Sequence, residues 1–484
     1  MNRFTFPKET HRRQAISPLR RIDRKPFMDS TPSGESNFST RSSSSTSNTL
    51  PQPPPWLRFV QDLLQQPIYL LGLQSILLLL AFGSDIDIVR TGEKDATQLS
   101  SQAAFKLLVL LCSGGLGAWG WWTQPNVRRL LKSFPGIFLT ALGVWYLLSF
   151  PFSMFPKLSL ASAITYWSLL LFAASALVHL GGTRCMMLYL IGNGAFLIGS
   201  VVLYFVQRDL TIMIEVMSLT NKVERFGGLG HPNTLGRITA TTALLLIGLV
   251  RMKKVRWQWL LAALPCMLAI SIASKSRSPV LAGILALAPL SLPYLQRPSI
   301  RLAAIMAGIP TLAMIAILFL SVDPDAWMGK ILAKFTKTGD MKEITTVTGR
   351  TEIWAFAWEK ACESPLFGKG AGSTPVLMEK HSGYAHNILL QPAVSLGFPA
   401  ALLLLILLIW NLYWIFRFPV PPVQMVTLFI LIIGITEAVM FSPLPEGITS
   451  LWMVCCLWPV WHAIDPRREP HDAHRDGPTW LPAG

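Results

Sequence analysis

Apolar runs of roughly 17 to 22 residues, long enough to cross the hydrocarbon core of a bilayer as helices, alternate with short polar connections along most of the chain. The pattern predicts an all-α polytopic membrane protein with about 12 transmembrane helices. The runs lie at 67–84, 102–122, 134–151, 159–178, 185–206, 233–250, 257–273, 279–295, 301–321, 387–414, 422–441 and 448–464.

The longest connection, residues 322–386, lies between the ninth and tenth runs, and we expect it to form a helical extracytoplasmic loop. Its polar and apolar positions predict amphipathic helices at Trp327–Phe335 and Thr351–Cys362, the second capped by Thr348. The tenth run is too long for one straight span, and Gly397 and Pro399 interrupt it. A broken or tilted helix with an interfacial first part is therefore expected there.

The composition agrees with a membrane protein, since 51% of the residues are hydrophobic and only 14% are charged; soluble domains carry about 25% charged residues. Residues 1–58 differ from the rest, because they are basic at first and then rich in Ser, Thr and Pro. Such a segment cannot bury a core, so we expect a disordered cytoplasmic tail. The transmembrane domain then covers 59–465, and 466–484 form a second cytoplasmic tail.

Short basic clusters predict the orientation of the chain. Cytoplasmic loops carry an excess of Lys and Arg, and the net charge of +16 is concentrated in the tails and a few short connections. With the N-terminal tail inside, the cytoplasmic side receives Arg128, Arg129, Lys132, His179, Arg184, Arg251, Lys253, Lys254, Arg256, Arg297, Arg301, Arg417, Arg467 and Arg468. Connections 207–232, 274–278 and 322–386 then face outward. We expect a multi-pass protein of the cytoplasmic (inner) membrane with both termini cytoplasmic, surrounded by membrane lipids and binding no nucleic acid.

Three arginines on the outer side form a candidate anion site. Arg225 precedes a glycine-rich stretch and the N-terminus of the sixth span, where His231 and Asn233 lie. An arginine beside a helix N-terminus favours anion binding; the alternative is an interfacial arginine paired with Glu224 or with lipid phosphates.

Arg277 and Lys275 lie in a very short outer turn, on the face where basic residues are disfavoured. Arg350 lies in the first turn of a predicted helix, where a cation is unfavourable unless an anion accompanies it. The alternatives are a side chain that reaches lipid phosphates for Arg277 and a solvated loop charge for Arg350.

His386 is the candidate for proton transfer, because histidine is the side chain best matched to that chemistry near neutral pH. It lies in the run Tyr384-Ala385-His386-Asn387 at the head of the tenth span. The alternative is an interfacial histidine bonded to the next turn. His231 and then His381 compete for the same role, His231 because it adjoins the glycine-rich stretch.

Four carboxylates on the outer side suggest secondary roles. Asp323 and Asp325 are spaced like a metal-holding pair, but a turn with Asp325 as a helix cap explains them more simply. Glu437 and Glu446 flank the outer end of the eleventh span, where they could pair with the arginines or hold a donor sugar.

The motifs, and their order along the chain, resemble those of the O-antigen ligase and O-antigen polymerase superfamily. The matching stretches are R-F-G-G-L-G-H-P-N-T-L-G at 225–236, S-K-S-R-S at 274–278, T-G-R-T-E-I-W at 348–354, and the run from Gly370 through His386 to Gly397. The resemblance implies an inverting oligosaccharide transferase that needs neither metal nor cofactor. Such an enzyme moves a glycan from undecaprenyl diphosphate to an acceptor hydroxyl, on another glycan or on lipid A core, outside the cytoplasmic membrane.

The resemblance also implies roles for single residues. Arg277 and Arg350 would hold the diphosphate, and His386 would be the base or positioner for the acceptor hydroxyl. Arg225 would assist in holding the diphosphate. Beside these residues, we expect His231, Asn233, Lys275, Tyr384 and Asn387 to bind substrate. The motifs do not decide between ligase and polymerase.

A polysaccharide or small-anion transporter is the alternative function, since about twelve spans suit it equally well. A carrier places its ionisable residues in mid-membrane, often in two repeated halves. Here the charged residues gather at one face and the halves show no evident repeat, which favours the transferase.

Overall fold

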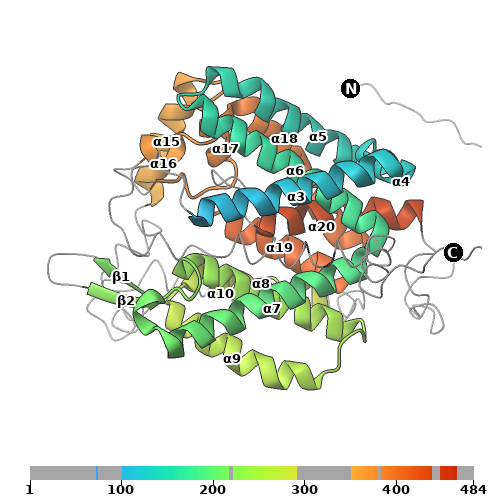
Figure 1. Cartoon of the computed structure of the whole chain (residues 1–484), viewed down its shortest axis with the longest axis vertical. Helices are drawn as coiled ribbons and strands as arrows, with labels where there is room; N and C mark the ends of the chain where they lie inside the picture. Colours follow the sequence, from blue (N-terminus) through green and yellow to red (C-terminus); the bar gives the residue numbers. More distant parts are fainter. Residues whose placement is uncertain are drawn as a thin grey trace, which may run out of the picture. The chain divides into compact units, whose positions relative to one another are not determined.

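The computed structural model describes residues 72, 74, 101–216, 222–291, 350–378, 383–438 and 447–465, all within a compact unit at Trp56–Gly484. These residues are mostly helical, which agrees with the predicted class (Figure 1). The helices are α3 (Ser101–Thr123), α4 (Pro125–Leu131), α5 (Phe134–Ser149), α6 (Pro156–Leu180), α7 (Gly182–Val206), α8 (Pro232–Arg251), α9 (Gln258–Ser274), α10 (Arg277–Leu285), α15 (Arg350–Glu363), α16 (Thr374–Leu377), α17 (Leu390–Leu396), α18 (Phe398–Arg417), α19 (Pro421–Gly434) and α20 (Gly447–Ile464).

Six helices of the described part are long and apolar enough to cross a membrane: Phe134–Phe152, Pro156–Leu180, Gly182–Val206, Pro232–Arg251, Phe398–Arg417 and Gly447–Ile464. Shorter apolar helices cover Gln258–Ser274, Arg277–Leu290 and Pro421–Gly434. The predicted span 301–321, both tails and most of 67–84 lie outside the described residues. The chain is therefore a polytopic membrane protein, and the number twelve stays a prediction.

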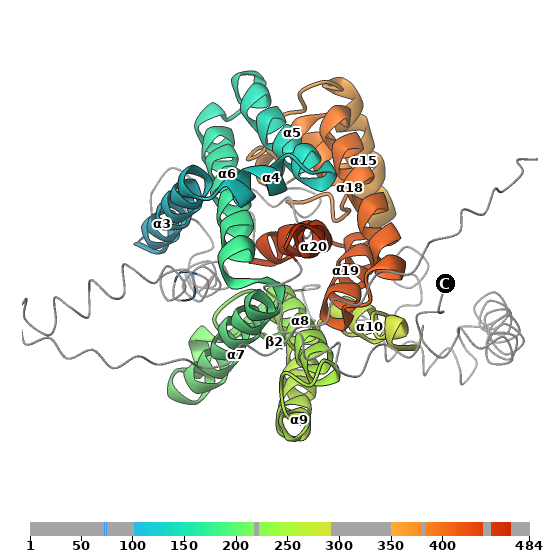
Figure 2. The ribbon, with the colours of Figure 1, turned by 90° about the vertical axis from the view of Figure 1, so that its right-hand side faces the viewer.

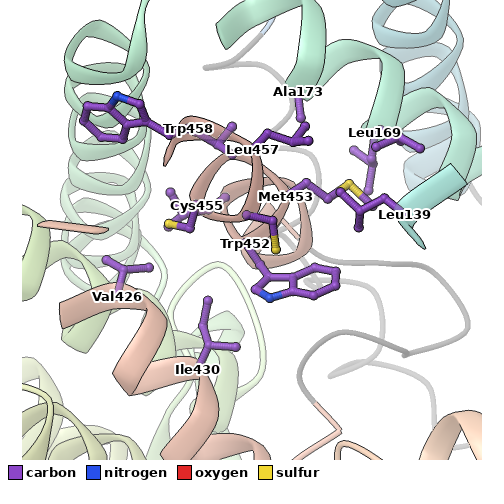
Figure 3. Close-up of a cluster of buried hydrophobic side chains, with 14 of the residues drawn as sticks. Leu139, Leu169, Ala173, Val426, Ile430, Trp452, Met453, Cys455, Leu457 and Trp458 are labelled. Carbon is purple, nitrogen blue, oxygen red and sulfur yellow. The ribbon is translucent and has the colours of Figure 1, made fainter. Parts of the chain in front are cut away.

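Helix α20 forms the centre of the main apolar core. It packs against α6 and α19, and Figure 2 shows it between those two helices. Its wide side chains are fully buried, among them Trp452 and Trp458, while apolar side chains of α5, α6 and α19 surround it (Figure 3). Gly182 lets α7 begin directly against the ring of Trp458, where a Cβ atom would collide with it.

Two predicted spans end earlier than their apolar runs. Helix α10 stops at Leu285 because Pro289 lacks the N–H that would bond the Leu285 carbonyl and its ring would collide with that carbonyl. Helix α19 stops at Gly434, whereas the predicted span continued to residue 441. The chain turns there, with Thr436 N bonded to Ile433 O at 3.0 Å. Glu437 consequently follows the helix instead of extending it.

The connection 207–232 contains a short hairpin that the helical prediction missed. Strand β1 (Ile212–Val216) pairs antiparallel with β2 (Lys222–Phe226), and Met213 lies opposite Arg225. Side chains alternate along a strand, so neighbours on β2 point to opposite sides. Glu224 is exposed and its carboxylate lies 3.7 Å from the guanidinium of Arg208, while Arg225 is 3% exposed. The suggested Arg225–Glu224 pair is therefore wrong.

The predicted break in the tenth run is confirmed at Gly397, which separates α17 from α18. Its φ is 88° with ψ at 172°, a conformation that only glycine adopts readily. A Cβ atom there would collide with the carbonyl group of Leu366. The same turn is held by Trp145 Nε1, which donates to Leu396 O at 2.8 Å.

The described part of the connection 322–386 packs against the helix ends at this break. Helix α15 confirms the helix predicted at 351–362 and packs against α17. Met154 N, between α5 and α6, donates to Lys369 O at 3.0 Å. Ile388 N donates to Gly434 O at the end of α19, at 2.8 Å. The start of the α17–α18 pair, the end of α19 and the described part of the connection 322–386 thus meet at one end of the helices.

Candidate active site

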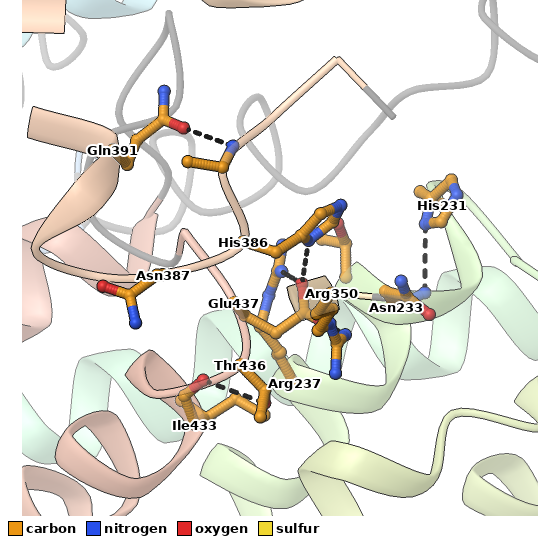
Figure 4. Close-up of polar contacts among 12 residues, drawn as sticks. His231, Asn233, Arg237, Arg350, His386, Asn387, Gln391, Ile433, Thr436 and Glu437 are labelled. Carbon is orange, nitrogen blue, oxygen red and sulfur yellow. Dashed lines mark hydrogen bonds and ion pairs between the residues drawn. The ribbon is translucent and has the colours of Figure 1, made fainter. Parts of the chain in front are cut away.

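The carboxylate of Glu437 is the centre of a polar cluster at that end of the helices. Arg350 Nη2 lies 2.8 Å from Glu437 Oε1, and His386 Nδ1 lies 3.2 Å from Oε2. Arg237 Nη1 lies 3.9 Å from Oε2. Figure 4 shows these three side chains gathered around Glu437. Four chain segments, α8, α15, the turn before α17 and the turn after α19, each contribute one residue.

Glu437 stays ionised in this setting. Its side chain is only 6% exposed, and burial alone would raise the pKa of the carboxyl group. The hydrogen bond from His386 and the charges of Arg237 and Arg350 outweigh burial and lower the pKa from 4.5 to about 2. An ionised carboxylate only accepts hydrogen bonds. The Nδ1 atom of His386 therefore carries the proton, and in the neutral ring Nε2 is left as the acceptor.

The main chain around His386 is fixed from both sides. His386 has a φ of 46°, an uncommon conformation for a residue with a Cβ atom. Ahead of it, Ala385 N donates to the buried Gln391 Oε1 at 2.9 Å. The His386 carbonyl accepts from Trp354 Nε1 of α15 at 3.4 Å. The ring of Tyr384 meets the imidazole edge to face, with centroids 6.3 Å apart.

Asn387 has a local role at the start of α17. Its Oδ1 accepts from Leu389 N at 2.9 Å and from Leu390 N at 3.0 Å, which satisfies donors that a helix start leaves unbonded. Its Nδ2 donates to Ile435 O at 3.3 Å. These bonds tie the His386 turn to the segment that carries Glu437, and the predicted substrate contact of Asn387 stays a prediction.

Arg225 lies in a second cluster, at the start of α8. Its Nη2 donates to Asn233 Oδ1 at 2.6 Å, and its Nε donates to Ser274 O at 3.0 Å. Ser276 Oγ donates to the same Asn233 oxygen at 3.3 Å. The guanidinium thus joins the hairpin to the start of α8 and the end of α9, so its geometry is that of a positioning residue.

The remaining predicted residues lie near this second cluster. His231 caps α8, since its Nδ1 accepts from Asn233 N at 3.1 Å. Lys275 is exposed with a φ of 51°, and Arg277 is exposed as the first residue of α10. Among the predicted catalytic residues, the structure brings Arg350 and His386 together through Glu437. Arg277 lies next to Ser276 instead.

One comparison with known proteins points to a family. Residues 262–405 match the family model described as O-antigen ligase. This match supports membership of the O-antigen ligase and polymerase superfamily, which the sequence motifs also resemble. The match thereby supports membrane glycosyl transfer of the ligase or polymerase type, for which the family implies glycan and lipid-linked substrates. No curated protein matches the chain.

The part of the chain that matches the superfamily model includes Arg277, Arg350 and His386. Glu437 and Arg237 lie outside it, yet they complete the cluster around His386. The suggestion that Glu437 pairs with an arginine is confirmed by its contact with Arg350. Sequence reasoning missed Arg237, although an arginine four residues inside an apolar span is itself a signal of function in a membrane protein.

Within the described ranges, no group of three or more His, Cys, Asp or Glu side chains converges as metal ligands do. Asp323, Asp325, His381 and Glu446 lie outside those ranges, so the suggestions made for them stay predictions.

Proposed function

We propose that the chain transfers a glycan from undecaprenyl diphosphate to an acceptor hydroxyl at the outer face of the cytoplasmic membrane, with inversion and without a metal. The observation that carries this proposal is the Arg350–Glu437–His386 arrangement, in which one buried carboxylate orients an imidazole and a guanidinium together. The superfamily match makes glycosyl transfer the chemistry to which this arrangement is applied.

His386 acts as the general base on the acceptor. With Nδ1–H donated to Glu437 at 3.2 Å, Nε2 accepts the proton of the acceptor hydroxyl as its oxygen attacks the anomeric carbon. The positive charge that forms on the imidazole is stabilised by the ionised Glu437. Positioned base catalysis of this kind contributes roughly 10²–10⁴-fold to a rate.

Arginines receive the charge of the leaving group. As the glycosidic bond breaks, its electron pair stays on the diphosphate oxygen, and fixed cations stabilise that charge. One nitrogen of Arg350 contacts Glu437, but a guanidinium has five N–H donors and can bind a phosphate as well. Arg277 and Lys275, exposed at the N-terminus of α10, hold the same diphosphate from the side of α8, to which α10 packs.

The step balances without a further reactant. The acceptor oxygen forms the new bond to the anomeric carbon from the face opposite the diphosphate, and the proton moves to His386. Undecaprenyl diphosphate leaves with the electron pair, and His386 later releases the proton to water. Attack from the opposite face inverts the anomeric configuration.

Glycan transfer by the purified chain tests the proposal. The donor is a glycan on undecaprenyl diphosphate, EDTA is present, and His386→Ala, Arg350→Ala and Arg277→Ala are compared with the native chain. We expect native turnover in EDTA and a loss of roughly 10²-fold or more in the His386 variant. Nuclear magnetic resonance of the product reports its anomeric configuration, and product size separates ligase from polymerase.

Arg208→Ala is the matched control, because its guanidinium makes an exposed ion pair with Glu224 and lies over the ring of Tyr204, but contacts none of the residues around Glu437. This variant should keep native turnover, since exposed pairs contribute about 0–1 kcal/mol. Native turnover by His386→Ala would overturn the assigned base. Movement of the donor across proteoliposomes without any transfer would favour the transporter.

A further inference from the structure

An apolar groove of about 650 Å³ opens between α15 and the α17–α18 pair. All of its lining residues are apolar or proline, and they include Trp358, Leu366, Leu390, Phe398 and Leu402. Several are strongly exposed, with 55% for Trp358, 60% for Leu366 and 58% for Leu402. The centroids of the Trp358 and Phe398 rings lie 5.4 Å apart, so the two walls of the groove touch through these rings.

The two walls of the groove belong to different environments. Helix α18 is a candidate membrane span, and Leu402 and Leu405 line the groove from it. Helix α15 carries Glu352, Glu359, Lys360 and Glu363 in fourteen residues, and this charge density excludes it from the hydrocarbon core. The groove therefore leads from the interfacial layer into the membrane. Without an occupant, Trp358 and Leu366 on the α15 side of the groove would be exposed beside lipid headgroups.

Both walls begin at the polar cluster described above. Helix α15 starts with Arg350, which contacts Glu437, and Trp358 follows eight residues later, about 12 Å along the helix axis. Leu389 and Leu390 line the groove and follow His386 by three and four residues. A molecule with an anionic head at Arg350 and a hydrocarbon chain directed along α15 would bring that chain to the groove.

We propose that the groove holds the first isoprene units of the donor's polyprenyl chain, the part next to the diphosphate. The inference rests on the proposed function, because it takes Arg350 as a diphosphate ligand. Membrane hydrocarbon is as apolar as the groove, so the groove gains little binding energy from burial. Its effect is to fix the direction in which the chain leaves the diphosphate and hence the orientation of the anomeric carbon.

The donor chain is favoured over the acyl chains of a lipid acceptor by the placement of Arg350. The helix that carries this diphosphate ligand also forms the groove wall. An acceptor presents its hydroxyl to Nε2 of His386, away from the Glu437 contact. A polyprenyl carrier also brings one chain to this groove, whereas lipid A brings several.

Leu402→Trp tests the proposal by filling the groove from its lipid-facing side. Leu412→Trp is the matched control, because Leu412 lies on the same helix, is 47% exposed and does not line the groove. Each variant is assayed with the same glycan diphosphate carried on an undecaprenyl chain or on a geranyl chain. We expect KM for both donors to rise about ten-fold in Leu402→Trp and to stay unchanged in Leu412→Trp, because a geranyl chain also carries the first isoprene units.

Equal KM values for Leu402→Trp and Leu412→Trp with the undecaprenyl donor would overturn the proposal and leave bulk lipid as the occupant. If Leu402→Trp instead raises KM for the acceptor, by an amount that depends on the acceptor's acyl chains, the groove holds the acceptor. That result would also overturn the proposal. Transfer of the geranyl-linked glycan by the native chain keeps the proposed function separate from this result.

Photo-crosslinking gives a second readout that needs no turnover. A diazirine placed in the first isoprene units of the undecaprenyl donor should label the peptide that contains Leu389 and Leu402, and Leu402→Trp should reduce that label. Labelling confined to other helices would overturn the proposal even if the kinetic result agreed with it.

Discussion

Replacement of Glu437 by glutamine tests the central idea of the site, that one ionised carboxylate orients both the base and an arginine. Glutamine has nearly the same shape but carries an NH₂ group in place of one carboxylate oxygen. The two carboxylate oxygens face donors from Arg350 and His386, with Arg237 a third, more distant neighbour. An amide oxygen can satisfy only one side, so its NH₂ group must meet a donor from the other side.

The pKa of Glu437 sets the magnitude of the effect on stability. The lowering of this pKa from 4.5 to about 2 corresponds to roughly 3 kcal/mol at about 1.36 kcal/mol per pKa unit. Since the folded pKa is depressed, this stabilisation is fully present above pH 4.5 and is lost as the pH falls through about 2. The native chain should therefore lose stability between these two pH values, and the part due to Glu437 should be absent in Glu437→Gln.

Two measurements check the Glu437→Gln prediction. Thermal unfolding in detergent across that pH range reports the stability, and glycan transfer at neutral pH reports activity, for which kcat should fall roughly 10²–10⁴-fold. Glu359→Gln is the control, because Glu359 is 67% exposed and forms a surface pair with Lys360; its stability should change by less than about 0.5 kcal/mol. Native kcat in Glu437→Gln together with an unchanged pH dependence of unfolding would refute the reasoning.

Three further substitutions test other parts of the site. Arg350→Lys should raise KM for the donor about ten-fold in transfer assays, because an ammonium group cannot bind a carboxylate and a phosphate in one plane; an unchanged KM would contradict a diphosphate role. Arg225→Ala should destabilise the chain by about 3 kcal/mol in thermal unfolding, since buried partners lose their donors, whereas Arg208→Ala should change little. Gly397→Ala should lower expression and the midpoint of thermal unfolding, because backbone strain costs about 1–3 kcal/mol and the new Cβ atom collides with neighbouring main chain. Gly194→Ala is the control and should be neutral or stabilising, because the space at its Cβ position is open.

The sequence predicted most helices of the described part because a bilayer imposes a length and a polarity on every span. The break at Gly397 was also predictable, since a glycine and a proline interrupt the same run. The hairpin was not, because five-residue strands such as Ile212–Val216 leave too short a pattern to separate from a connection. The early end of α19 at Gly434 was hidden because apolar residues continue beyond it.

The sequence predicted the site only to the extent that the membrane topology places certain residues on the same side of the membrane. That reasoning found Arg350 and His386, and it suggested that Glu437 pairs with an arginine. It could not show that Arg225 is engaged by Asn233 and a main-chain carbonyl, because those contacts depend on how the hairpin packs.

The two polar clusters are mechanically connected through the first turns of α8. Asn233 and Arg237 are four residues apart, so their side chains lie on one face of the helix, with Cβ atoms about 5–6 Å apart. Asn233 accepts a hydrogen bond from Arg225, whereas Arg237 forms an ion pair with Glu437. The hairpin therefore fixes the turn of α8 that carries Arg237 to the Glu437 carboxylate, while Arg350 of α15 holds the same carboxylate from another chain segment. A buried carboxylate without such partners would take up a proton and release the imidazole. The ionisation of Glu437 thus depends on α8 and α15 both being correctly placed, and the tautomer of His386 depends on that ionisation. The contacts that place these helices come from several parts of the sequence and not from one motif.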